Sequence, residues 1–353
     1  MGTAANPAFP RAADPAFAYL PLAQARLVAC WEHGDSKKMT KYRTRLPQLD
    51  GGLFVTDGGL ETTLIFHDGI DLPLFAAFPL LDDSDGRETL RRYFTRYAGI
   101  ARANGLGFIL ESPTWRASPD WAEQLGYTPG ALDRANQDSI ALMAEVRAAH
   151  ETPGTPVVIS GCVGPRGDGY DPGAAMTPDQ AEAYHGVQIG SFAGTEADMV
   201  TAITMTNAEE AIGVTRAARA AGLPVVISFT VETDGRLPTG QPLKEAVMAV
   251  DAATDAGPAY YMINCAHPTH FETVLAADEA WLQRLRGIRA NASRLSHAEL
   301  DEAEELDDGD PVEFGQQHRA LRLRHAHINV FGGCCGTDHR HVEQICGSFR
   351  AAA

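Results

Sequence analysis

The feature that most constrains the fold is a regular alternation of short apolar runs and longer segments whose apolar residues recur at helical spacing. Each apolar run is short enough for one buried strand, and short connections join it to the segment that follows. Strands that alternate with helices in this way build a parallel sheet. The expected strands are residues 53–56, 107–111, 156–160, 198–204, 224–230, 260–264, 285–291 and 327–331.

Eight strand–helix units close naturally into a (β/α)₈ barrel. We therefore predict an α/β protein with a TIM-barrel fold and one domain over residues 46–353. A doubly wound open sheet is the alternative, but the repeat number disfavours it. The first strand is also followed by Asp57-Gly58-Gly59 and not by the Gly-x-Gly-x-x-Gly turn of dinucleotide-binding sheets.

Two segments depart from the alternation. Residues 1–45 contain Pro7, Pro10, Pro15 and Pro21, which interrupt regular structure, so we predict a flexible N-terminal extension. An acidic insertion is expected at about residues 294–313, because the stretch 299–313 carries nine carboxylates and no basic residue. A run of this kind is typical of a solvated loop or helix face.

The net charge of −17 repels phosphate backbones, so nucleic-acid partners are not expected. No apolar run approaches the roughly 18 residues that a membrane span requires. The six cysteines lie in a long chain with no secretory signal pattern, which favours free thiols or metal ligands over disulfides. We expect a cytoplasmic protein that is a monomer or a small homo-oligomer, with small molecules as its partners.

Cys334 and Cys335 are adjacent, follow an apolar run, and are bracketed by glycines. Neighbouring side chains on a strand point to opposite faces, so both thiols reach one point only if the backbone leaves strand geometry. Cys265 ends another expected strand. Carboxyl ends of barrel strands share one rim, and three thiolates there would bind zinc and leave one position open. Two buried small hydrophobes, a structural zinc clip, or a redox-sensitive pair are the alternatives.

Several turns resemble the homocysteine S-methyltransferase family, which includes the betaine- and S-methylmethionine-using enzymes and the homocysteine module of methionine synthase. The resemblance runs from about residue 53 to 349. Its most specific part is the pair of cysteine turns. The segments that carry it are Asp57-Gly58-Gly59-Leu60-Glu61-Thr62, Ile159-Ser160-Gly161-Cys162-Val163-Gly164-Pro165, Ser228-Phe229-Thr230, Asn264-Cys265-Ala266-His267-Pro268 and Gly332-Gly333-Cys334-Cys335-Gly336-Thr337.

This resemblance implies the same barrel, Zn²⁺ held by Cys265, Cys334 and Cys335, and methyl transfer to homocysteine to give methionine. The donor would be a small sulfonium or quaternary ammonium compound. Coordination to zinc makes chemical sense, because a free thiol with a pKa of about 8.5 is mostly unreactive at neutral pH. The resemblance further implies substrate-binding roles for Asp57, Gly58, Gly59, Ser228 and Asn291, the last as a ligand that zinc exchanges for substrate.

One position departs from the family pattern. Family members commonly end the fourth strand with a glutamate that holds the substrate ammonium, and here Ile203 occupies that place. Glu111 at the end of the second strand, or Glu232 after the fifth, would supply the carboxylate instead. A different small mercapto acid is the alternative acceptor.

The donor is not determined by the sequence: S-methylmethionine, betaine, dimethylsulfoniopropionate and S-adenosylmethionine all remain candidates. Trp115 and Trp121 follow the second strand and would either wall a cationic donor or pack within their own loop. A barrel metallohydrolase is disfavoured, because no His-x-His pair follows the first strand.

Overall fold

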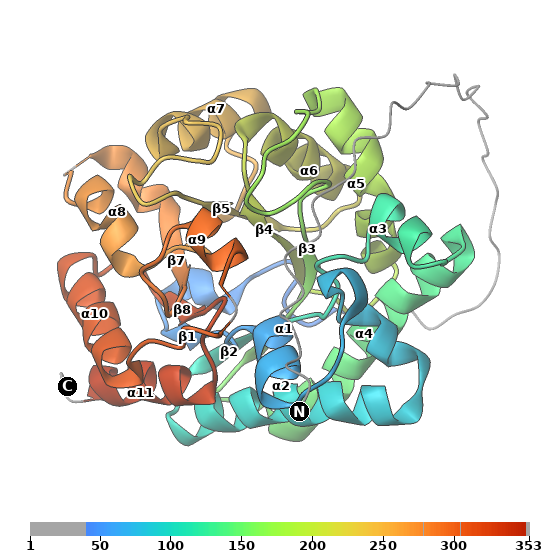
Figure 1. Ribbon diagram of the computed structural model, residues 1–353, viewed down its shortest axis with the longest axis horizontal. Coiled ribbons are helices and arrows are strands. Elements are labelled where there is room, and N and C mark those ends of the chain that lie inside the picture. Colours follow the sequence, from blue (N-terminus) through green and yellow to red (C-terminus); the bar gives the residue numbers. More distant parts are fainter. Residues whose placement is uncertain (1–39, 278, 304, 351–353) are drawn as a thin grey trace.

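The computed structural model describes residues 40–277, 279–303 and 305–350. Parallel strands form a closed barrel in which each strand pairs with the next in sequence and the last pairs with the first (Figure 1). The TIM-barrel prediction is confirmed, with small shifts in strand ends. The strands are β1 Phe54–Val55, β2 Gly107–Glu111, β3 Val157–Val163, β4 Met199–Met205, β5 Val225–Thr230, β6 Tyr260–Asn264, β7 Leu285–Ala290 and β8 Val330–Gly333.

Helices surround the barrel (Figure 1). Polar side chains cap several of these helices at their N-termini. Thr177 forms a capping box with Gln180, as its position before Pro178 predicts. The long helix after β1 is capped by Asp83, whose side chain accepts from the amides of Asp85 and Gly86. The helices are α1 Leu60–Thr62, α2 Ser84–Ala103, α3 Pro119–Gln124, α4 Pro129–His150, α5 Pro178–Ala193, α6 Ala208–Ala220, α7 Leu243–Thr254, α8 Pro268–Leu275, α9 His297–Asp301, α10 Pro311–Arg324 and α11 His339–Arg350.

The barrel interior changes from apolar to polar along the strands. One apolar layer contains Phe54, Ile109, Val158, Met199, Val226, Met262 and Val330. Side chains two residues apart on a strand share a face, so the next layer toward the carboxyl ends follows from the sequence. That layer is buried yet polar, and it lies just below the carboxyl ends of the strands: Thr56, Glu111, Ser160, Thr201, Ser228, Asn264 and Arg289.

Residues just before β1 form hydrogen bonds with the opposite end of the barrel. The Tyr42 amide donates to Asp198 Oδ1 at 2.8 Å, and the Arg43 guanidinium donates to the carbonyl of Ala197 at 2.7 Å. Residues 40–45, which we placed in the flexible extension, are therefore attached to the barrel by hydrogen bonds. Residues 1–39 of that extension lie outside the described part of the chain.

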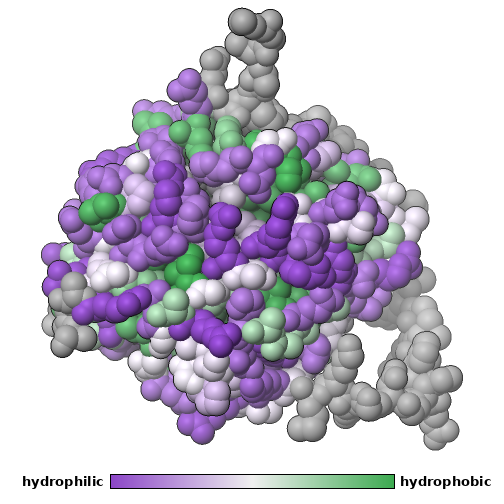
Figure 2. Space-filling model, turned by 90° about the horizontal axis from the view of Figure 1, so that it is seen from below, coloured by the Kyte–Doolittle hydropathy of each residue, from purple (hydrophilic) through white to green (hydrophobic). Residues whose placement is uncertain are grey.

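Within the described residues, no helix is both long and apolar enough to cross a membrane. The face shown in Figure 2 is mostly hydrophilic, with small separate apolar patches between the charged residues.

Candidate metal centre

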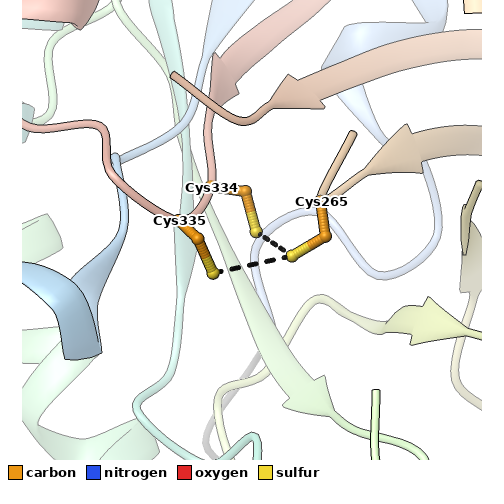
Figure 3. Close-up of side chains that lie close together, drawn as sticks. All are labelled: Cys265, Cys334 and Cys335. Atoms are coloured by element: carbon orange, nitrogen blue, oxygen red, sulfur yellow. Dashed lines mark hydrogen bonds between the residues drawn. The ribbon is translucent and has the colours of Figure 1, made fainter. Parts of the chain in front are cut away.

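Three thiols converge at the carboxyl end of the barrel. Cys265 follows β6, Cys334 and Cys335 follow β8, and their side chains point toward one another (Figure 3). The Sγ of Cys265 lies 2.6 Å from that of Cys334 and 3.8 Å from that of Cys335. All the sulfur atoms of this group lie within 4.8 Å of one another. The structure thus brings together the cysteines that the sequence singled out.

The backbone at these turns is fixed by close contacts. Cys265 has a φ of 53°, an uncommon conformation for a residue other than glycine. The Cys334 amide donates to the Ala290 carbonyl at 2.8 Å, and the Cys334 carbonyl accepts from the Thr337 hydroxyl at 2.7 Å. Gly59 lets the first turn approach, since a Cβ there would lie 2.6 Å from the Cys334 carbonyl oxygen. The first and last turns of the barrel therefore fix each other.

This contact makes Gly59→Ala a steric probe of the centre. Gly59 has a negative φ, so alanine is allowed by the backbone, but its methyl group would push the Cys334 carbonyl away. We expect metal affinity to fall about tenfold or more, as for other changes beside ligands. Competition with a chromophoric chelator measures this affinity. Gly99→Ala in α2, where a Cβ meets no atom within 4 Å, is the matched control. Equal affinity in both variants would contradict the steric role.

Electrostatics favour a cation at the thiol cluster. Hydrogen bonds from Cys265 and Cys335 lower the pKa of the Cys334 thiol well below its ordinary value, and the Arg289 guanidinium nearby adds to this effect. Asn264 Nδ2 also approaches the Cys334 sulfur at 3.8 Å. The contact with Cys334 raises the pKa of the Cys265 thiol. For Cys335, the contact with Cys265 lowers the pKa, but the contact with Cys334 and burial outweigh it and raise the pKa. Cys334 is therefore the thiol of this group that loses its proton most readily.

The donor set fits a zinc ion. Three cysteines supply sulfur ligands, and within residues 40–277, 279–303 and 305–350 no fourth cysteine joins this group, so one coordination position is left open, as in catalytic zinc sites. Asn291 is buried between two residues that bond to the cysteine turn, and its Oδ1 has no hydrogen-bond partner. A buried polar atom without a partner is costly unless a ligand satisfies it.

A cavity of about 60 Å³ lies against the thiols. Its wall contains Asp57, Gly58, Gly59 and Glu111 together with all three cysteines, as the sequence predicted. Ile203 lines the same cavity, so an apolar side chain does stand where a glutamate was expected. Trp115, one of the two rings considered for a donor wall, lines the cavity as well. Other lining residues were not singled out for substrate: Glu61, Ser112, Cys162, Asp168, Tyr170, Thr204 and Arg289.

Asp57 forms a buried ion pair in the cavity wall. Its Oδ1 accepts from Arg289 Nη2 at 2.6 Å, and its Oδ2 accepts from the Tyr93 hydroxyl at 3.2 Å. Burial raises the pKa of Asp57, while the Arg289 guanidinium works against that rise. Burial acts to lower the pKa of Arg289, but attraction by Asp57 and Glu111 outweighs it and raises the pKa. Arg289 therefore remains charged.

Glu111 and Glu61 supply further carboxyl groups. Burial raises the pKa of each to about 7. Glu111 is 4% exposed, and its Oε2 has no hydrogen-bond partner. An unsatisfied carboxyl oxygen at a cavity wall is available to a ligand that donates a hydrogen bond.

Two predicted residues act elsewhere. The Ser228 hydroxyl donates to Asn264 Oδ1 at 2.6 Å and does not line the cavity, so it orients the amide that approaches Cys334. Glu232 Oε1 lies 3.0 Å from His297 Nδ1, and the other ring nitrogen of His297 contacts the Cys265 carbonyl. The Glu232 carboxylate therefore contacts His297, the first residue of α9.

The rings of Trp115 and Trp121, which were considered for the wall of a donor site, both contact an arginine of the same loop. The Arg116 guanidinium lies 4.1 Å from the Trp115 ring centre and 3.7 Å from that of Trp121. Arg116 is buried and also donates to the Gly167 carbonyl. Trp121 therefore packs within the loop, whereas Trp115 packs on Arg116 and also lines the cavity beside the thiols.

Sequence reasoning missed Tyr170, which lies in the loop after β3. Its hydroxyl donates to Cys335 Sγ at 3.5 Å, and its ring stacks on His297 with centres 4.0 Å apart. Neither residue follows a strand directly, so strand-end position gave no signal. Arg289 occupies an inward strand position, where a buried basic residue was a signal that could have been used.

Comparison with known proteins agrees with this architecture. A family model described as homocysteine S-methyltransferase matches residues 54–349. The metallated homocysteine methyltransferase MmuM from Escherichia coli shares 16% identity at a TM-score of 0.66, covering 87% of this chain and 99% of that one. The oxidized form of MmuM shares 18% identity at the same TM-score of 0.66, covering 89% and 100%. No curated protein shows a significant match.

The fold and the thiol cluster define a (β/α)₈ barrel with a group of three cysteines at the carboxyl ends of its strands. The chain belongs to the homocysteine S-methyltransferase family, because the family model spans most of its length. The reaction class of the family is methyl transfer to homocysteine.

Proposed function

We propose that this protein is a zinc-dependent S-methyltransferase that moves a methyl group from a small onium donor to homocysteine and yields methionine. The observation that carries the proposal is the convergence of Cys265, Cys334 and Cys335 on the wall of a cavity that also contains Asp57 and Glu111. Fold resemblance alone would not support a chemistry, but this donor set does.

The cysteines would hold Zn²⁺, and Asn291 is the candidate for the position that substrate takes over. Bound zinc lowers the pKa of a coordinated thiol so that it stays a nucleophilic thiolate at neutral pH. The chain's own residues position the acceptor. Asn264, held by Ser228 and Thr204, approaches the Cys334 sulfur and keeps that ligand in place.

The cavity offers partners for both ends of an amino acid. Arg289 is the basic residue among the described residues of its wall, so it is the partner for the acceptor carboxylate. The Arg289 Nε donates to the Gly333 carbonyl, and its Nη2 donates to the Gly58 carbonyl and to the Asp57 carboxylate. Glu111 has an unsatisfied oxygen and would accept a hydrogen bond from the ammonium group, replacing the glutamate absent at Ile203.

Glu111→Gln tests this assignment. Because the pKa of Glu111 is raised to about 7, its carboxylate form predominates above that pH and is lost below it. We expect the kcat/KM of the wild-type protein for homocysteine to fall about tenfold per pH unit below pH 7 where this group controls binding. Glu111→Gln should lower kcat/KM about tenfold or more at pH 8 and flatten this profile, with unchanged zinc content.

A matched substrate pair separates the acceptor alternatives. 4-Mercaptobutanoate keeps the thiol and carboxylate of homocysteine but lacks the amine. The wild-type protein should prefer homocysteine, and Glu111→Gln should remove most of the preference. If 4-mercaptobutanoate is the better substrate of the wild-type protein, the acceptor is a simple mercapto acid, the alternative that Ile203 favours.

The function itself is tested by incubating zinc-loaded protein with homocysteine and each candidate donor. Formation of methionine is followed by mass spectrometry. The proposal predicts metal-dependent methionine formation with at least one onium donor. Absence of product with every donor, in protein shown to contain zinc, would contradict it.

A further inference from the structure

A second, larger cavity of about 280 Å³ lies beside the first. The two share Thr62, Phe75, Tyr170 and Cys335 in their walls, so the same metal-binding thiol faces both. One cavity reaches into the barrel, toward Glu111 and Arg289. The other is bounded by the turns after β1 and by the acidic insertion. A transfer reaction between two small molecules needs two adjoining spaces of this kind.

The wall of the larger cavity has a one-sided charge. Asp71, Asp301, Glu305 and Asp307 contribute carboxylates, and no basic residue is found among the described residues of this wall. Aromatic rings lie there too: Phe66, Phe75 and Tyr170. Aromatic faces and carboxylates together favour an organic cation and disfavour an anion.

Two arginines that lie near this wall in the sequence form ion pairs outside it. Arg294 pairs with Glu313, and Arg340 pairs with Asp308 and Asp338. Neither arginine is among the lining residues. A carboxylate placed in this cavity would therefore meet like charges without a compensating cation, which is unfavourable.

The acidic insertion is fixed onto the metal centre. His297 at the start of α9 contacts the Cys265 carbonyl at 2.7 Å and stacks on Tyr170. The Ser293 hydroxyl donates to Asp307 at 2.6 Å and holds the far part of the segment. The insertion is thus part of the rim beside Cys335, where its charge acts on whatever enters the larger cavity.

We propose that this larger cavity binds the methyl donor and that it selects donors with a net positive charge over zwitterions that carry a carboxylate near the onium centre. This inference rests on the proposed function. The acceptor thiolate attacks the donor methyl carbon, a new S–C bond forms, and the onium S–C or N–C bond breaks with its electron pair leaving on the donor. The departing thioether or amine has lost its positive charge, so the acidic wall no longer attracts it at that centre.

The test compares two donors that share a dimethylsulfonium centre and the same carbon skeleton, so that each loses a methyl group to become a thioether. 3-Dimethylsulfoniopropanamide is a cation, whereas dimethylsulfoniopropionate has the same skeleton with a carboxylate in place of the amide. We expect kcat/KM with homocysteine to be at least about tenfold higher for the amide, since tenfold corresponds to about 1.4 kcal/mol. Equal or faster transfer from the zwitterion would overturn the proposal.

Charge removal assigns the effect to this wall. In the variant Asp71→Asn/Glu305→Gln, two of the three exposed carboxylates of the wall are lost, and the preference for the amide should fall about fivefold, as expected for partly exposed charges. The control Asp68→Asn/Glu302→Gln removes the same charge from exposed neighbours outside the wall. The control should keep the preference, and an equal loss in both variants would overturn the assignment.

Direct binding separates this inference from the proposed function. Trimethylsulfonium is titrated into zinc-loaded protein without acceptor, and binding is followed by saturation-transfer NMR. Weaker binding in Asp71→Asn/Glu305→Gln than in the control supports the cavity even if no thiol is methylated. Equal binding in the two variants overturns the cavity assignment even if methyl transfer is observed.

Discussion

Replacing Cys265 by alanine is expected to remove the bound zinc and to lower methyl transfer to homocysteine by about a thousandfold or more. Cys265 is the single ligand that β6 contributes, and its sulfur contacts both sulfurs from β8. Without it, two adjacent thiols remain, too few to hold a catalytic zinc site. The loss acts on the reacting thiol itself, because a homocysteine thiol without zinc stays mostly protonated at neutral pH.

Metal content by plasma mass spectrometry and methionine formation are measured on the same samples. Cys346→Ala is the matched control, since Cys346 is buried in α11 and is not part of the thiol group. The control should keep its zinc and its activity. Zinc loss in Cys265→Ala without loss of methyl transfer would contradict the proposed role of the metal.

The second large effect is expected for Arg289→Leu. This change leaves Asp57 buried without its cation, and breaking a buried ion pair on one side costs about 3–5 kcal/mol. Urea denaturation of the metal-free protein measures the free energy of unfolding without a contribution from zinc. The exposed pair of Arg216 and Asp179 is the control, and Arg216→Leu should cost at most about 1 kcal/mol.

The loss in free energy of unfolding caused by Arg289→Leu should depend on pH, in a direction that follows from the pKa of Asp57. Burial already raises the pKa of Asp57, and removal of the guanidinium raises it further. A carboxyl whose folded pKa exceeds its unfolded pKa favours the folded state while it is protonated, and that benefit is lost as pH rises through the folded pKa. The difference in free energy of unfolding between the variant and the wild type should therefore become smaller at acidic pH. A gap that widens there would show that Asp57 is not the group left unpaired.

The barrel was predictable because its strands are buried on both faces and read as mostly apolar runs. The run at 225–230, for example, is fully buried in β5. Convergence of Cys265 with Cys334 followed from topology, since each ends a strand and all strands end on one rim. The glycines beside the thiols also had a local meaning, since Gly336 has a φ of 76° and a Cβ at Gly333 would clash with the Thr337 hydroxyl oxygen.

The remaining site residues depend on tertiary contacts that local patterns do not encode. Tyr170 reaches Cys335 from a loop after β3, and its position is set by stacking on a histidine from a distant insertion. Trp115 and Trp121 have the composition of a cation-binding wall, but the cation they hold is the neighbouring Arg116. The composition of that loop indicated a cation–π interaction but did not indicate that Arg116 would be the cation.

The acidic insertion shows how position changes the meaning of a charge run. Nine carboxylates without a base are typical of a solvated segment. The structure places part of the run against the cavity that contains Cys335, with His297 attaching it to the Cys265 carbonyl. The same charges can then act on a donor molecule, a role that depends on where the segment folds back.

Zinc K-edge X-ray absorption of the loaded protein, with and without homocysteine, tests the central claim most directly. Three protein thiolates and an exchangeable fourth ligand predict three sulfur neighbours at about 2.3 Å plus one nitrogen or oxygen neighbour. Homocysteine should convert this shell to four sulfurs, because its thiolate takes the open position. A shell with fewer than three sulfurs, or one that homocysteine leaves unchanged, would contradict activation of the acceptor at Cys265, Cys334 and Cys335.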